Sequence, residues 1–186
     1  MTERLPPLSE DAMNDAQRKA AAALIAGPRK AVFGPFIALL RSPELLDRLQ
    51  RVGEYLRFQS TVPPKLGEFA TLIAARHSIN QFEWAAHHPL AIEAGIAPET
   101  VDAIESHVRP STMAQDEAIV YDFVAQLLAT HRVDDANYAR AVKLLGEQGV
   151  VDLVATVGYF GLVNELMNVA GTPPPANGVR PLPDVL

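Results

Sequence analysis

Apolar residues recur three or four positions apart along most of this chain. That spacing places side chains on one face of an α-helix, whereas a half-buried strand needs apolar and polar residues in strict alternation. Alternating runs of Val, Ile and Thr are missing, and Ala and Leu are abundant throughout. The pattern therefore predicts an all-α, multi-helical and mostly antiparallel domain.

Glycine and proline divide this pattern into separate helices. Ser42-Pro43-Glu44 and Ala97-Pro98-Glu99 are typical helix starts, because proline fits the first helical turn. Gly34-Pro35 is expected to open a short turn. In the helix that begins at Ser42, the expected apolar stripe is Leu45, Leu49, Val52 and Leu56. The expected helices cover residues 9–26 (or 14–26), 42–58, 64–79, 80–95, 97–107, 114–130, 134–148 and 150–169.

The two ends of the chain are expected to differ from the helical middle. Residues 1–8 resemble a loose leader, and the tail over residues 171–186 is too rich in proline to be helical. We expect this tail to lie extended along a surface or along a neighbouring subunit. The chain is thus divided into an N-terminal helical extension (residues 1–40), one domain (residues 41–170) and a Pro-rich tail (residues 171–186).

Composition and charge narrow the classes of partner and compartment. The chain has 186 residues, of which 48% are hydrophobic and 20% charged, with a net charge of −6. No basic patch is visible, so neither nucleic acid nor an anionic membrane is an expected partner. No signal peptide or membrane-spanning run is evident, and a cytoplasmic protein is the expectation. The absence of cysteine excludes disulfides and thiol-based peroxidase chemistry.

The segment over residues 76–95 carries the densest group of chemically active side chains. Asn80, Glu83 and His87 follow one another at i, i+3 and i+7, so a helix would project them from one face. A carboxylate four residues from an imidazole can hydrogen-bond to it, fix its tautomer and raise its basicity. This arrangement suits proton transfer and needs no cofactor.

Neighbouring residues are candidates for contacting a substrate at the same place. Asn80 could orient a substrate carbonyl or cap its helix, and His77 is expected to line the cavity. Arg76 could bind a substrate carboxylate or lie at the surface, and Trp84 could form cavity wall or core. The Glu and His residues here are possible metal ligands, but no H-E-x-x-H motif is present, and we predict no metal and no cofactor.

The segment resembles the carboxymuconolactone decarboxylase family, which includes the alkylhydroperoxidase-D-like proteins. The run F-E-W-A-A-H-H-P-L-A matches an aromatic-Glu-Trp-x-x-His-x-Pro-x-Ala string of the cysteine-free branch. Redox members have Glu, then Cys-x-x-Cys twelve residues later, then His after four more. Here Glu68 and His87 match that spacing, while Asn80 and Glu83 stand at the cysteine positions. The resemblance covers about residues 40–130 and implies the family's all-α fold.

The resemblance also implies a function and an assembly. Glu68 would relay protons to His87, with Glu83 facing the cavity, and the chain would form a homo-oligomer, a trimer or hexamer. The expected activity is cofactor-free acid/base chemistry on a small carboxylated lactone or a related intermediate of aromatic-compound breakdown. Two alternatives stay open: a peroxidase-related protein, disfavoured because the chain has no cysteine, and a ligand-binding oligomer without catalysis.

Overall fold

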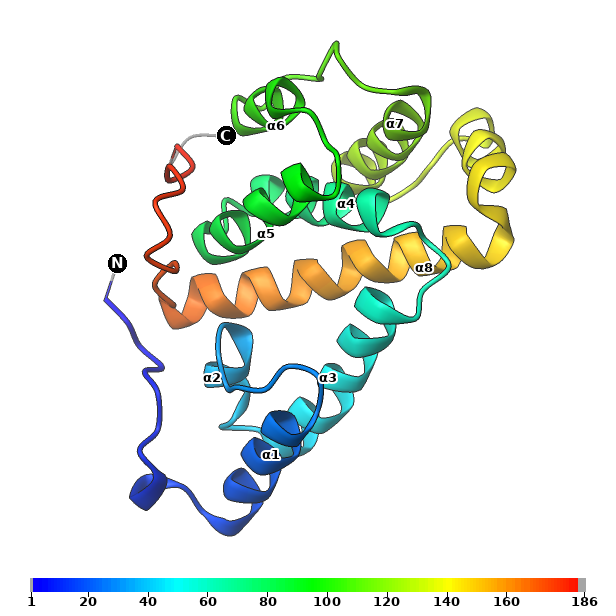
Figure 1. Ribbon diagram of the computed structural model, residues 1–186. Helices are drawn as coiled ribbons and strands as arrows, with labels where there is room; N and C mark the ends of the chain where they lie inside the picture. The colour runs from blue at the N-terminus through cyan, green and yellow to red at the C-terminus, as the bar shows by residue number, and fades with distance from the viewer. Residues whose placement is uncertain (1, 184–186) are drawn as a thin grey trace.

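The computed structural model describes residues 2–183, and all regular secondary structure in that range is helical (Figure 1), which confirms the all-α prediction. A short 3₁₀ helix, η1, precedes the α-helices. The elements are η1 (Glu10–Ala12), α1 (Asp15–Ala26), α2 (Pro35–Leu39), α3 (Pro43–Phe58), α4 (Pro64–His77), α5 (Gln81–Glu93), α6 (Pro98–Glu105), α7 (Gln115–Thr130) and α8 (Asp135–Ala170).

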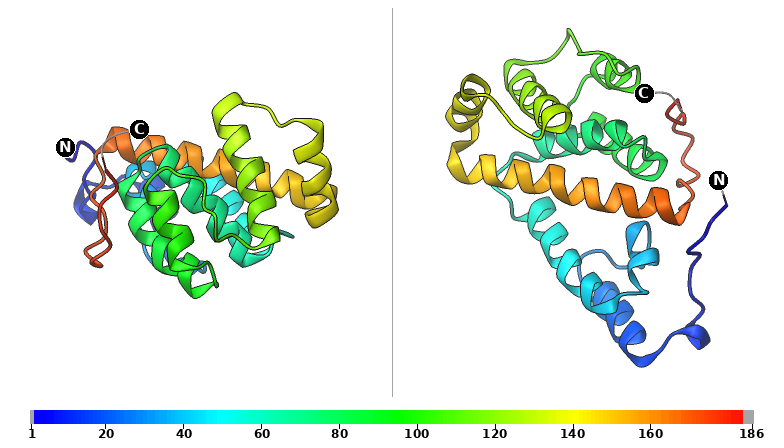
Figure 2. Two further views of the ribbon diagram at one scale, coloured as in Figure 1. Left: turned by 90° about the horizontal axis from the view of Figure 1, so that it is seen from above. Right: turned by 180° about the vertical axis from the view of Figure 1, so that it is seen from behind.

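Helix α8 runs through the middle of the molecule, with α4–α7 on one side and α1–α3 on the other (Figures 1 and 2). Helix α4 packs against α5, α7 and α8. It is buried almost all round over residues 69–76, so it forms the centre of the larger hydrophobic core. A second cluster, which includes Leu24, Phe36, Leu40 and Leu46, joins α1, α2 and α3. The candidate site lies where these two clusters meet α8.

The buried face of α3 matches its predicted apolar stripe only in part, since Leu49 and Leu56 pack into the core as expected. The predicted stripe included Leu45 and Val52, but these side chains are 44% and 45% exposed. The helix instead buries Leu46, Gly53 and Leu56. The predicted stripe left out Gly53, yet Gly53 is the residue that lets α3 approach Tyr159 of α8 closely.

The long helix α8 changes direction at Gly146. This residue has φ 72° and ψ 172°, a conformation that glycine adopts readily and other residues avoid. The sequence pattern predicted a break at Gly149, which instead lies buried inside the helix. By length and composition α8 could cross a membrane, but 56% of its most apolar window is buried inside the molecule, which is typical of a core helix.

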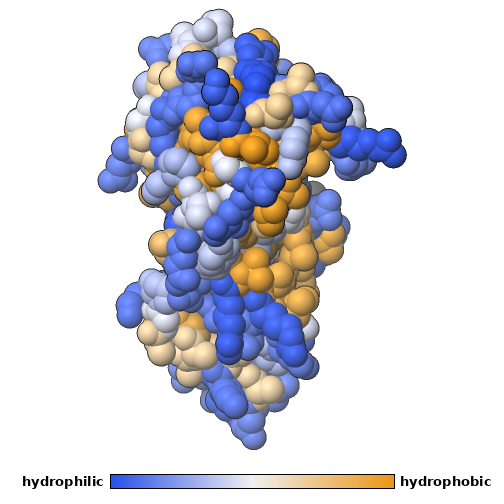
Figure 3. Space-filling view, turned by 90° about the vertical axis from the view of Figure 1, so that its right-hand side faces the viewer, coloured by the Kyte–Doolittle hydropathy of each residue, from blue (hydrophilic) through white to orange (hydrophobic). Residues whose placement is uncertain are grey.

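One face of α8 leaves large apolar side chains exposed. Val151, Val154, Leu162 and Val169 are each at least 42% exposed. Apolar surface also gathers between charged groups on the side of the molecule that is at the right of Figure 1 (Figure 3). Because such surface usually marks contact with another molecule, it supports the prediction of a homo-oligomer, which stays a prediction.

Both ends of the described chain are held by neighbouring elements. The backbone N–H of Arg4 donates to the carbonyl of Ala170 at the end of α8. The described part of the tail is non-helical, as predicted, and crosses α5. There the Gln81 amide exchanges two hydrogen bonds with the backbone of Leu182, which is buried. The tail therefore packs on its own chain, and it does not by itself require a neighbouring subunit. Residues 184–186 lie outside the described range.

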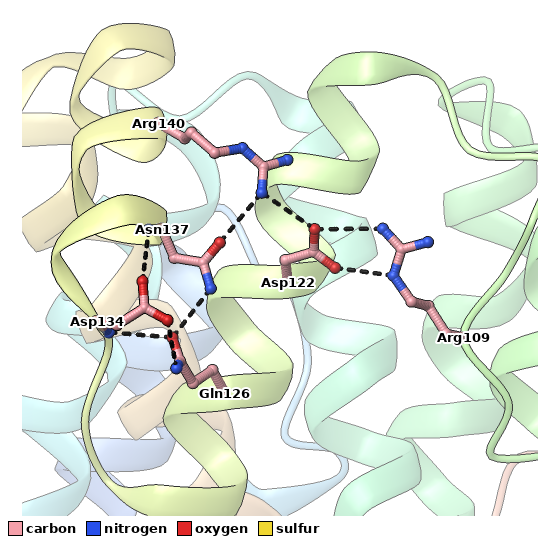
Figure 4. A network of polar contacts seen from close by, with 6 residues as sticks. All are labelled: Arg109, Asp122, Gln126, Asp134, Asn137 and Arg140. Atoms are coloured by element: carbon pink, nitrogen blue, oxygen red, sulfur yellow. Dashed lines mark hydrogen bonds and ion pairs between the residues drawn. The ribbon is translucent and has the colours of Figure 1, made fainter.

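Two polar clusters hold helices together away from the candidate site. Asp122 of α7 forms ion pairs with Arg109 and Arg140, which tie α7 to the preceding loop and to α8 (Figure 4). Asp152 of α8 is buried and accepts hydrogen bonds from the side chains of Tyr55, Ser60 and Thr61. Burial opposes the charge of Asp152, but these donors outweigh it and lower its pKa. This second cluster fixes the connection between α3 and α4 against α8.

Candidate functional site

The turn between α4 and α5 sets the position of the candidate site. Ile79 has a left-handed backbone conformation, with φ 48°, and Asn80 then caps α5 by accepting a hydrogen bond from the backbone N–H of Glu83 at 2.8 Å. The Asn80 amide also donates to the carbonyl of Asn164 and to the side chain of Asn168. The start of α5 is thereby held against α8, and Glu83 and His87 project from the same face of α5.

His87 lies between two carboxylates that bind its two ring nitrogens. Nδ1 is 2.5 Å from Oε2 of Glu68, on α4, and Nε2 is 3.0 Å from Oε2 of Glu83, on α5. The side chains of His87 and Glu83 are only 5% and 6% exposed, and that of Glu68 is 19% exposed. The ring of Phe160 from α8 packs edge-on against the imidazole, with 5.2 Å between ring centroids. The geometry therefore forms a Glu–His–Glu chain of hydrogen bonds in a largely dry setting.

The two carboxylates keep His87 charged. Burial lowers the pKa of an imidazole, but the hydrogen bonds and negative charges of Glu68 and Glu83 outweigh it and raise the pKa of His87 from 6.5 to about 9. For Glu68, burial disfavours the charged carboxylate, but the hydrogen bond and positive charge of His87 and the charge of Arg57 outweigh burial and lower the pKa of Glu68. At neutral pH, His87 is thus an imidazolium that donates both N–H groups.

Two cavities meet at His87. The larger one, of about 240 Å³, is lined mostly by apolar side chains and includes Glu83 and His87. The smaller one, of about 100 Å³, lies on the Glu68 side and is also lined by hydroxyl groups of Ser60, Thr71 and Thr156. Glu68 and Glu83 both contact His87, but they open onto two cavities, because Glu83 lines the larger one and Glu68 the smaller one. The larger cavity is lined by Arg29, Phe33, Pro35, Phe36, Arg57, Phe82, Glu83, Ala86, His87, Leu90, Tyr159, Phe160 and Val163.

The other four candidate residues do not line the larger cavity. Asn80 takes the capping role, and His77 lies at the end of α4 beside a different hollow, formed with α7 and α8. Trp84 is fully buried in the main core. Arg76 is buried as well, and its Nε donates to the backbone carbonyl of Glu105. Arg76 and His77 lie in the last turn of α4 and do not reach the larger cavity, and Trp84 lies on the part of α5 that packs into the main core.

Several residues at the cavity were missed by the sequence analysis because they come from distant segments. Arg29 and Phe36 belong to the first forty residues, and Arg57 comes from α3. Tyr159 comes from α8. The sequence signal that could have pointed to the first segment is a loop between two Gly-Pro pairs that carries Arg29 and Phe33, with Phe36 directly after it.

Within residues 2–183, no group of three or more His, Cys, Asp or Glu side chains is arranged to hold a metal ion. Glu68 and Glu83 each use a carboxylate oxygen on His87, and both imidazole nitrogens are occupied in the same contacts. The donor set is therefore arranged for proton transfer between its own members.

Comparisons with known proteins agree on the fold. The sequence matches no protein-family model and no curated protein. A peroxidase-related protein from Ralstonia eutropha JMP134, described as an alkylhydroperoxidase AhpD core, is similar with a TM-score of 0.74 and 18% identity. That match covers 93% of this chain and 92% of the other. A peroxidase-related protein from Silicibacter sp. TM1040 has a TM-score of 0.70 at 13% identity, over 92% of this chain and 90% of that one.

A third similar structure is a cysteine-to-alanine variant of the debrominase Bmp8 in complex with 2,3,4-tribromopyrrole, with a TM-score of 0.70 and 12% identity. The match covers 95% of this chain and 94% of the other. All three similarities extend over nearly the whole described structure at low identity. The chain therefore has the multi-helical alkylhydroperoxidase-D-like fold, as the resemblance in its sequence implied.

Proposed function

We propose that this chain is a cofactor-free acid/base enzyme that acts on a small carboxylated lactone or a related intermediate of aromatic-compound breakdown. The observation that carries the proposal is the buried His87 imidazolium, held between Glu68 and Glu83 at the wall of a 240 Å³ cavity. Cavities for drug-sized ligands measure about 300–1,000 Å³, so this one suits a smaller molecule.

The chemistry follows from the charge state of the site. When a carboxylated lactone loses CO2, the electrons of the broken carbon–carbon bond remain on the substrate as a dienolate, and one carbon must then take up a proton. The group that supplies it has to hold a proton at neutral pH and release it to a stronger base, and His87, with its pKa raised to about 9, meets both requirements. Glu83 lines the same cavity and connects His87 to the substrate.

The Glu68 side completes the proton cycle. After each turnover His87 must be reprotonated, and Glu68 contacts its other nitrogen from the smaller, more polar cavity. A proton can thus enter through Glu68 and leave towards the larger cavity. The two ends of the relay stay separate, as a directional transfer requires.

The similar structures support this proposal only in part. Two of them carry the description peroxidase-related, but a thiol mechanism needs a cysteine, and this chain has none. The third binds a halogenated pyrrole, which supports a small planar ring as the class of ligand. A cytoplasmic location and a trimeric or hexameric assembly remain predictions alongside the activity.

The test is turnover of 4-carboxymuconolactone in heavy water, followed by CO2 release and by deuterium in the product. We expect one deuterium per product and a strong loss of rate in His87→Gln and Glu83→Gln. The matched controls are His88→Gln and Glu93→Gln, which change the same residue types on the same helix outside the relay. Equal rates in relay and control variants would refute the proposal, as would absence of turnover across a panel of related lactones and carboxylates.

A further inference from the structure

The first forty residues contribute a cationic group to the larger cavity. Arg29 follows α1 and lines the cavity together with Tyr159 of α8 and His87 of α5. Gly34, with φ 54°, lets this segment pass close to α5, because a side chain at this position would meet the ring of Phe82 at 2.7 Å. The N-terminal segment is therefore part of the cavity wall.

Arg29 presents one edge of its guanidinium without an anionic partner among the described residues. Its Nε and Nη2 atoms are buried without a well-formed hydrogen bond to a described residue, although the guanidinium lies close enough to Tyr159 to interact with its hydroxyl. The face of the guanidinium stacks on the Phe36 ring, with 4.4 Å from Cζ to the ring centroid. Nε–H and Nη2–H form the edge that binds the two oxygens of a carboxylate side by side. Burying such donors unpaired is costly, so the edge is suited to an anionic ligand.

The charges around the cavity favour an anionic ligand. Arg29, Arg57 and the His87 imidazolium are positive, and Glu68 and Glu83 are negative. Glu68 and Glu83 both pair with the His87 imidazolium, and Nη2 of Arg57 lies 3.9 Å from Oε1 of Glu68. Arg29 forms no ion pair with a described residue at 4.0 Å or less, so one positive charge remains for the ligand.

Gly53 of α3 makes room for this arrangement. A Cβ atom there would lie 2.7 Å from Arg29 Nη2, and it would be closer still to the hydroxyl of Tyr159. The arginine edge and the tyrosine hydroxyl therefore lie side by side above Gly53. Together they offer three N–H or O–H donors to one anionic group.

We propose that Arg29 and Tyr159 form the recognition site for one carboxylate of a compact ring acid, which places the ring against Glu83 and His87. The inference deepens the proposed function and rests on the same cavity, but carboxylate binding needs no turnover. It also reassigns the role for which Arg76 was a candidate, because Arg76 lies outside the cavity. The N-terminal segment is thus needed for ligand specificity as well as for packing.

The experiment uses benzoate as the carboxylate probe and benzamide as its neutral counterpart, with binding measured by calorimetry at pH 7. We expect benzoate to bind and benzamide to bind at least about tenfold more weakly. Arg29→Met should weaken benzoate binding about 10- to 100-fold, the range for a lost hydrogen bond to a charged group. Arg48→Met is the control, because Arg48 is a solvent-exposed arginine on α3 that does not line the cavity.

Two further measurements keep the inference testable if Arg29→Met folds poorly. In the wild-type protein, the Nε–H resonance of Arg29, assigned by its absence in Arg29→Lys, should shift when benzoate is added. Gly53→Ala should weaken benzoate binding, since the added methyl group displaces both donors. An unshifted Nε–H signal, equal binding of benzoate and benzamide, or equal losses in Arg29→Met and Arg48→Met would overturn the proposal.

The same experiment separates this inference from the proposed function. His87→Gln should abolish turnover and retain benzoate binding. If no lactone is turned over but benzoate binding depends on Arg29, the recognition site stands and the proposed reaction falls. If turnover is found without any dependence of substrate affinity on Arg29, the reaction stands and the recognition site falls.

Discussion

Replacing His87 with Gln should remove a part of the folding stability that is present at neutral pH and is lost as the pH rises towards 10. In the folded protein the two carboxylates raise the pKa of His87 from 6.5 to about 9. A difference of one pKa unit corresponds to about 1.4 kcal/mol, so the fully protonated state stabilises the fold by about 3 kcal/mol. Because the folded pKa lies above the unfolded one, this stabilisation is complete below pH 6.5 and is lost as the pH rises through 9.

The assay is urea unfolding of the wild type and of His87→Gln at several pH values from 7 to 10. We expect the stability difference between the two proteins to shrink by about 2 to 3 kcal/mol across this range. The lowered pKa of Glu68 has the opposite pH dependence: its contribution to stability is lost as the pH falls below the usual pKa range of a carboxyl group. A stability difference that stays constant from pH 7 to 10, or an imidazole that titrates near 6.5 by NMR, would refute the reasoning.

Three further predictions concern the rest of the molecule. In a urea titration, Asp152→Asn should lower the unfolding free energy by about 1–3 kcal/mol, because an amide cannot accept from all the donors that face Asp152. The control Glu147→Gln changes an exposed side chain and should leave the unfolding free energy unchanged. Sedimentation of the wild type should show an oligomer at micromolar concentration, and a stable monomer would contradict this. Leu162→Glu should weaken the oligomer, whereas Val108→Glu, at an exposed residue outside α8, should not. Dithiol-dependent reduction of hydroperoxides should stay at background, since the chain has no cysteine, and turnover above background in metal-free protein would contradict the assignment.

Much of the helical framework could be predicted, because local signals determine it. Prolines at the starts of α3, α4 and α6 marked these helices, and the i, i+3, i+7 spacing indicated that Glu83 and His87 share a face. The contact between Glu68 and His87 was accessible because the hairpin between α4 and α5 is short. The resemblance to a known family supplied the spacing that singled out Glu68.

The parts that could not be predicted depend on tertiary contacts. Hydrophobicity alone placed Leu45 on the buried face of α3, whereas the approach of Tyr159 to Gly53 turns that face by one position to Leu46. Two glycines near the middle of α8 could each have ended a helix, and only the backbone of Gly146 takes the unusual conformation. Arg29 enters the cavity from a loop without any periodic pattern, so sequence spacing could not connect it to His87.

The bend at Gly146 divides α8 into two parts that should unfold locally at different free energies. Before the bend, α8 buries only Ala141, and all its other buried residues follow it. The ion pair that holds the first part, between Arg140 and Asp122, is partly exposed and therefore contributes little stability (Figure 4). Backbone amides over residues 135–145 should therefore exchange with solvent deuterium by local opening, at a lower free energy than the segment that carries Tyr159 and Phe160. One continuous helix should thus belong to two cooperative units, and the more protected of them should carry the candidate cavity.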